Sequence, residues 1–183
     1  MRTKISLISL LFILLCLGCA TPKFYQEILS TYPKGKKDDF ILKSSISPHK
    51  IVFKSLKDEL KNSSHIIYHF SPNAEWYSKE FSGVIYDVDN NRYYYFENSN
   101  KHPRKITVSE EYPYPEDNYY KFVIDNFRNG KIDYLKKLGE ISGHSGYRTN
   151  EVIYDINLKK NSYNRYTFED FLFMNGKPTK DIN

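Results

Sequence analysis

The chain has 183 residues, and its 27 basic and 22 acidic side chains give a formal net charge of +5. This excess is too small to indicate nucleic-acid binding, which needs a strong basic stripe. The two cysteines are Cys16 and Cys19, so the chain beyond them has no disulfide, no cysteine nucleophile and no cysteine-ligated metal. The composition therefore predicts a globular protein that is stabilised by its hydrophobic core alone.

The N-terminal segment, up to Ala20, has the pattern of an export signal. Two cations precede an apolar run at positions 5–17, and the small residue Gly18 follows. The run is shorter than the roughly 20 apolar residues that a membrane-spanning helix needs. Gly18, Cys19 and Ala20 resemble the lipobox of bacterial lipoproteins, in which a peptidase cuts before a cysteine that has received a diacylglycerol.

This resemblance implies that residues 1–18 are a signal peptide and that Cys19 is the lipid anchor. Cys16 is the rival anchor, but Leu15 before it is bulky for a cleavage position. The other alternative is plain secretion with cleavage after Gly18 or Ala20. Several acyl chains on one cysteine attach a protein stably, whereas one chain holds it only marginally. The resemblance places the protein in a bacterial membrane, and Ala20 after the cysteine favours the periplasmic side of the outer membrane.

Cleavage before Cys19 removes Arg2 and Lys4 but no acidic residue, which leaves 25 basic and 22 acidic side chains at positions 19–183. This length suits one domain with a proper core. We expect residues 19–39 to form the lipidated N-terminus, a short helix near 22–31 and a linker. Residues 40–183 are then a single α+β domain.

Apolar spacing, caps and turn residues predict the elements of that domain. Strands are expected at 40–46, 65–70, 83–88, 92–96, 106–108, 152–158 and 163–173. Helices are expected at 48–61, from about 118 to 129 and at 132–138, with Gly130 as the glycine that ends the second one. The predicted fold is an antiparallel twisted sheet of about five to seven strands with two or three helices packed against it.

One stretch of sequence occurs twice in similar form. Residues 84–89 read VIYDVD and residues 152–157 read VIYDIN, and each stretch begins a predicted hairpin. A duplicated half of the domain is one interpretation. The other is that hairpins rich in β-branched residues, Tyr and Asp look alike by chance.

Two patterns resemble metal sites in part, but each lacks residues that a metal site needs. Residues 87–91 spell D-x-D-x-N, but Arg92 replaces the glycine of a calcium loop and Asn98 replaces its bidentate glutamate. We therefore expect an ordinary hairpin turn there. His65 and His69 share one face of a predicted strand, but no third ligand is apparent. We expect two surface or half-buried histidines and no metal or other cofactor.

Two patterns are weighed as catalytic sites. Residues 143–146 read GHSG, but Tyr147 breaks the G-x-S-x-G pattern and the predicted order is helix, loop, strand. Four carboxylates surround the proline-rich loop: Glu110, Glu111, Glu116 and Asp117. Glu116 and Asp117 are better explained as residues that begin a helix, where its dipole favours anions. No catalytic residue is therefore assigned.

Aromatic residues are the remaining candidates for a binding surface. Seven of them could form a platform for sugar rings or for a protein partner: Trp76, Tyr77, Tyr93, Tyr94, Tyr95, Tyr112 and Tyr114. Strand alternation sends Tyr94 to the face opposite Tyr93 and Tyr95, so at least one of these three rings should lie outside the core. We select Trp76, Tyr77 and Tyr94 as candidate ligand-binding residues.

The sequence thus predicts a lipid-anchored protein of the bacterial cell envelope with a non-enzymatic binding or assembly role. Its expected partners are the membrane, through the N-terminal lipid, and an envelope protein or glycan, but not nucleic acid. A glycan-binding module that uses exposed aromatic residues is the first alternative. A small envelope hydrolase is the second, and it is disfavoured because no nucleophile–base pair is evident.

Overall fold

The computed structural model describes residues 48–72, 80–99, 101–102, 105–142 and 150–180. Several predictions fall outside these residues: the signal peptide, Cys19, the helix near 22–31 and the strand at 40–46. Trp76, Tyr77 and the 143–146 motif also lie outside them.

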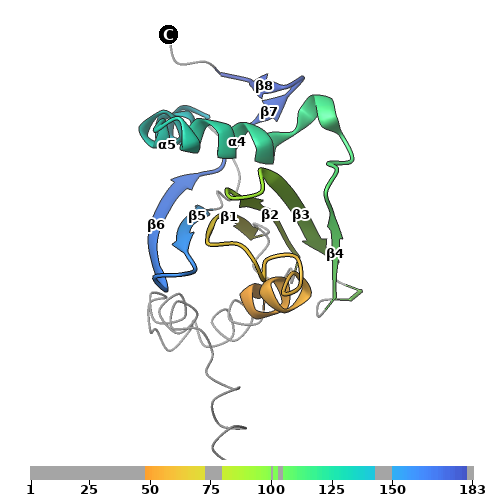
Figure 1. The fold of residues 1–183 in the computed structure, drawn as a ribbon. Helices are drawn as coiled ribbons and strands as arrows, with labels where there is room; N and C mark the ends of the chain where they lie inside the picture. Colours follow the sequence, from red (N-terminus) through yellow and green to blue (C-terminus); the bar gives the residue numbers. More distant parts are fainter. Residues whose placement is uncertain (1–47, 73–79, 100, 103–104, 143–149, 181–183) are drawn as a thin grey trace, which may run out of the picture.

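Six strands form one antiparallel sheet (Figure 1), in the order β4-β3-β2-β1-β5-β6. Their bounds are β1 (His65–Pro72), β2 (Phe81–Asp87), β3 (Arg92–Asn98), β4 (Ile106–Ser109), β5 (Asn150–Asn157) and β6 (Ser162–Glu169). Every neighbouring pair is antiparallel. The predicted α+β class and strand number are confirmed, and the 65–70 strand occupies the centre of the sheet.

The helices lie on both faces of this sheet (Figure 1). Residues 48–55 are helical and lie against one face, whereas α4 (Tyr119–Arg128) and α5 (Ile132–Ile141) cover the other. The side chain of Asn118 caps α4 by accepting a hydrogen bond from the Lys121 backbone N–H at 2.9 Å. Gly130 separates the two helices with φ of 71°, a left-handed conformation that glycine adopts without strain.

Strand alternation divides the interior into two cores. The first core includes Ile66, Tyr68 and Phe70 of β1, together with Val52 and Leu56 of the 48–60 segment. The opposite face of the sheet packs Val84 and Tyr86 of β2, Ile153 of β5, and Val123 and Leu135 of the two helices. Because both faces are covered, β1 is buried without interruption from residue 66 to residue 70, as its nearly continuous apolar sequence would require.

The end of the chain differs from the prediction. The expected strand at 163–173 stops at Glu169, and Phe171 turns into the second core with 5% of its surface exposed. A separate two-stranded hairpin then forms from β7 (Phe173–Met174) and β8 (Lys177–Pro178) beside the short helix η1 (Pro115–Asp117). The strand ends there because the burial of the Phe171 side chain beneath the helices stabilises the fold more than further strand pairing would. No helix among the described residues is long and apolar enough to cross a membrane.

The two hairpins with similar sequences use the same turn. Each has a four-residue loop whose last residue is an asparagine in the left-handed region, Asn91 with φ of 53° and Asn161 with φ of 51°. The first loop residue of each donates its backbone N–H to a carbonyl just before or at the start of β1, Val88 to His65 and Leu158 to Ser64.

Equivalent residues of the two hairpins face opposite sides of the sheet. Tyr86 lies in the second core and Tyr154 in the first. The reason is that β2 and β5 pair with opposite edges of β1 while running in the same direction. A rotation of half a turn about an axis along β1 therefore relates the β2–β3 hairpin to the β5–β6 hairpin. Because this rotation exchanges the two faces of the sheet, the similar sequences of the two hairpins bury equivalent residues on opposite faces.

Candidate functional site at the end of the sheet

A row of polar side chains crosses four neighbouring strands on the face that α4 covers. In register, Ser71 of β1 lies opposite Ser82 of β2, and Ser82 lies opposite Glu97 of β3. On the other side of β1, the Ser71 hydroxyl donates to Glu151 Oε1 of β5 at 2.8 Å. The row therefore places two carboxylates and two hydroxyls along one end of the sheet.

Behind this row, His69 and Glu151 form a buried pair. Nε2 of His69 lies 2.7 Å from Oε2 of Glu151, and the two side chains are 0% and 3% exposed. The remaining ring nitrogen of His69, Nδ1, has no hydrogen-bond partner among the described residues. The expectation that His69 would be on the surface or half-buried is wrong, because α4 covers the face that simple alternation would leave in solvent.

The first turn of α4 closes over the pair with two tyrosines. The ring centroids of Tyr119 and Tyr120 lie 6.0 and 5.5 Å from that of His69. The Tyr120 hydroxyl shares a hydrogen bond of 2.7 Å with the Ser82 hydroxyl. Burial, reinforced by the negative charge of Glu151, raises the pKa of both phenols above its ordinary value. Both tyrosines therefore stay protonated and act as neutral polar groups over a buried carboxylate.

His65 makes a separate pair with Asp155. Their closest atoms, Nε2 and Oδ1, are in hydrogen-bond contact, and the side chains are 40% and 30% exposed. Since His65 and His69 each have their own carboxylate partner on β5, they do not converge on one site. Among the described residues, no group of three or more histidine, cysteine or acidic side chains could hold a metal ion.

The sequence reasoning missed both carboxylate partners. Asp155 lies between two apolar residues of the predicted 152–158 strand, and Glu151 lies directly before that strand. Their four-residue spacing equals that of His65 and His69. In an antiparallel pair such matching spacing can place both couples side by side, and this was the available signal.

The order in which Ser71, Glu151 and His69 are hydrogen-bonded argues against a serine nucleophile. A serine nucleophile needs the imidazole between the hydroxyl and the carboxylate, so that the ring accepts the hydroxyl proton. Here the carboxylate of Glu151 lies in the middle, with Ser71 on one oxygen and His69 on the other. His69 is also fully buried. The arrangement suits hydrogen bonding and positioning better than acyl transfer.

The hairpin turn at 87–91 uses its carboxylates internally. Asp87, fully buried, accepts hydrogen bonds from the backbone N–H groups of Asp89 and Asn90 and from the Ser63 hydroxyl. Asp89 accepts from the backbone N–H and hydroxyl of Ser64, and these hydrogen bonds lower its pKa. The expected hairpin turn therefore replaces the calcium interpretation.

Tyr94 does not lie where a ligand could stack on it. It is 4% exposed in the first core, while Tyr95 is 8% exposed in the second. Tyr93 is not a member of the second core and packs against it while partly buried. None of the three rings is exposed for stacking, because each face of the sheet has its own helical layer. Of the aromatic candidates that the structure describes, Tyr114 is the exposed one, at 65%.

A pocket of about 220 Å³ opens at the same end of the sheet as the polar row. Its lining combines carboxylate, hydroxyl and amide groups with two apolar side chains: Ser71, Pro72, Glu80, Phe81, Ser82, Glu97 and Asn98. Such a lining can accept hydrogen bonds from hydroxyl or amino groups of a small ligand, and its two carboxylates favour a neutral or cationic one. The pocket and the polar row together are the candidate functional site.

Comparison of the sequence with protein-family models finds no matching family. Comparison with curated proteins and with solved structures finds no match either.

Proposed function

We propose that this protein is a lipid-anchored component of a bacterial cell envelope, held in the membrane through Cys19, whose folded domain has a binding or assembly role. The observation that carries the proposal is the cysteine placed directly after Gly18 at the end of the N-terminal apolar run. Cleavage there would expose a residue that can bear several acyl chains, which is enough for stable attachment.

The buried polar groups support binding over catalysis. Glu151 separates Ser71 from His69, and α4 keeps His69 from solvent. The solvent-accessible part of the candidate site is instead the pocket beside Ser82 and Glu97, which presents hydrogen-bonding groups without a nucleophile–base pair. This favours a role in holding a ligand or partner at the membrane.

Metabolic labelling with radioactive palmitate tests the anchor. We expect the label in the wild-type protein and in Cys16→Ser, and its loss in Cys19→Ser, with a matching loss of the acyl mass from the N-terminal peptide. The Cys16→Ser variant is the matched control, because it changes a thiol in the same segment. Retention of label in Cys19→Ser would contradict the assignment.

A second candidate function, glycan binding, is favoured by the lining of the pocket. The two carboxylates, the hydroxyls and the amide of this lining are suited to the hydroxyl and amino groups of an amino sugar. This version of the proposal does not need Tyr94, which is buried. Calorimetric titration with glucosamine and chitotriose tests it. Heat that disappears in Glu97→Gln would support it, and absence of heat with the wild-type protein would reject it.

A further inference from the structure

A row of exposed lysines follows the segment that leads into the sheet. The lysine row consists of Lys50, Lys54, Lys57 and Lys61, all exposed. Their spacings of four, three and four residues place them on one side of a helical path. Backbone hydrogen bonds of 3.0 Å from Leu56 to Val52 and from Leu60 to Leu56 continue this path beyond the helical residues 48–55. Val52, Leu56 and Leu60 are buried, so the packing of these residues in the first core fixes the position of the lysine row on the surface.

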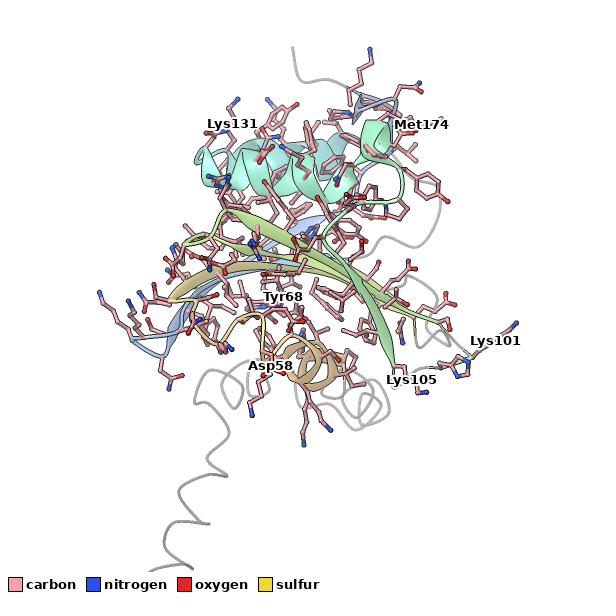
Figure 2. The ribbon with its side chains drawn as sticks, turned by 45° about the vertical axis from the view of Figure 1, so that its right-hand side comes forward. Asp58, Tyr68, Lys101, Lys105, Lys131 and Met174 are labelled. Carbon is pink, nitrogen blue, oxygen red and sulfur yellow. The ribbon has the colours of Figure 1, made fainter. Side chains whose placement is uncertain are left out.

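The lysine row belongs to one pole of the molecule. Figure 2 shows Asp58, from the same segment, on one side of the sheet, and Lys131 and Met174 on the opposite side. None of the ion pairs among the described residues involves a lysine of the row. Asp58 and Glu59 are exposed nearby and offset part of its charge.

The net charge of the mature chain is also distributed unevenly between the segment that contains the lysine row and the rest of the chain. Residues 19–61 contain nine basic and five acidic side chains, whereas residues 62–183 contain 16 basic and 17 acidic ones. All of the net positive charge therefore lies in the part of the chain between the proposed anchor and the start of the sheet. A basic segment beside a membrane anchor is attracted to anionic lipid headgroups within about a Debye length.

We infer that the lysine row docks the domain on the anionic headgroups of the bilayer that holds the Cys19 lipid. The inference rests on the proposed anchor and adds an orientation to it. The chain from Cys19 to Pro48 could span at most about 100 Å if it were fully extended, so the lipid alone does not decide which face meets the membrane. With the row docked, the polar row and the α4–α5 layer belong to the side of the sheet that faces away from the bilayer.

The size of the effect follows from the charge of the row. Each basic side chain near an anionic surface strengthens attachment by about fivefold at physiological salt. Removing the four positive charges should therefore reduce the ratio of docked to undocked domain by much more than fivefold. High salt should reduce it as well, because the Debye length falls to about 3 Å at 1 M.

The experiment measures the distance of a probe from the headgroups on the full lipidated protein. Because no cysteine follows Cys19, Asp58→Cys introduces a single site for a fluorophore, and Met174→Cys, 57% exposed, is the matched site at the opposite pole. The protein is reconstituted into vesicles of phosphatidylcholine with or without phosphatidylglycerol. Quenching by a headgroup-spin-labelled lipid is then compared between the two probes.

We expect strong quenching at position 58 in vesicles that contain phosphatidylglycerol, and weak quenching at position 174. Replacement of all four lysines of the row by Gln should abolish the difference. The matched control replaces four exposed lysines of the other face by Gln, namely Lys131, Lys136, Lys137 and Lys177, and should leave it unchanged. Equal quenching of both probes, or an equal response to both sets of substitutions, would overturn the inference. Failure of the protein to float with any vesicles would instead overturn the anchor.

Discussion

Breaking the buried His69–Glu151 pair should destabilise the fold more than replacing both residues. In Glu151→Met, the fully buried His69 loses the partner of Nε2, and Ser71 loses its acceptor. Leaving a buried polar group without its hydrogen-bond partner costs about 1–3 kcal/mol for each group. That is a large part of the total stability of a domain, which is about 5–15 kcal/mol.

The double substitution His69→Phe with Glu151→Met should recover most of this loss. A phenyl ring at position 69 would lie among Tyr119, Tyr120 and Phe168, whose centroids are 5.5–6.0 Å from the imidazole. Apolar replacement of a whole buried pair is often neutral or stabilising. We therefore expect the double variant to be within about 1 kcal/mol of the wild type.

Urea unfolding at neutral pH provides the measurement, with the slope of the transition as a check that the unfolded state is unchanged. The two single variants, the double variant and the wild type form a double-mutant cycle. A coupling free energy of about 2 kcal/mol or more is expected. Coupling below about 0.5 kcal/mol, the usual limit of additivity between independent sites, would show that the two residues contribute separately and would refute the reasoning.

Three further predictions concern the packing around the sheet. Burial lowers the pKa of His49 from 6.5 to about 4, so between these pH values the unfolded chain binds a proton that the folded chain does not. The stability present above pH 6.5 should be lost as the pH falls towards 4, by about 3 kcal/mol, and His49→Phe should remove this part of the pH dependence of urea unfolding. Gly139→Ala should lower the melting temperature by several degrees, because the added Cβ would lie 2.4 Å from the Glu169 carbonyl oxygen. An unchanged melting temperature would contradict the close approach of α5 to β6. Asn91 has φ of 53°, and its side chain accepts a hydrogen bond from the Tyr86 hydroxyl. Asn91→Val and Asn91→Gly both remove that acceptor, so the valine variant should be less stable than the glycine variant by about 1–3 kcal/mol, the cost of the left-handed conformation. Equal urea midpoints for the two variants would show that this conformation is not required.

The predicted elements succeeded where local chemistry is decisive. The Asp/Asn turn at 87–91 forms a hairpin because Asp87 binds the turn's own backbone N–H groups. Asn118 caps α4 and Gly130 ends it, as their side-chain chemistry and backbone freedom require. These interactions join residues a few positions apart, so short stretches of sequence contain all the information that they need.

The candidate site depended on contacts that local patterns do not contain. His69 and Glu151 are 82 residues apart, and their pairing requires β5 to lie beside β1 in one register. Tyr94 illustrates the same limit, since its burial follows from the position of the 48–60 segment on the first face. Alternation identifies which residues share a face, but not whether another layer covers it.

The amino-acid sequence was sufficient for the α+β class, the hairpins, both ends of α4 and the start of α5, and it gives the expectation of a lipid at Cys19. Each of these depends on neighbours within about one helical turn or one hairpin. The expected end of α5 at residue 138 was wrong, because the helix continues through Gly139 to Ile141. Only the tertiary structure decided that helices cover both faces of the sheet, that His69 is paired with Glu151 inside the protein, and that the lysine row and the polar row belong to opposite sides. The physical reason is that burial is a property of packed layers, and the same alternating strand can face water or a helix depending on what the rest of the chain places against it.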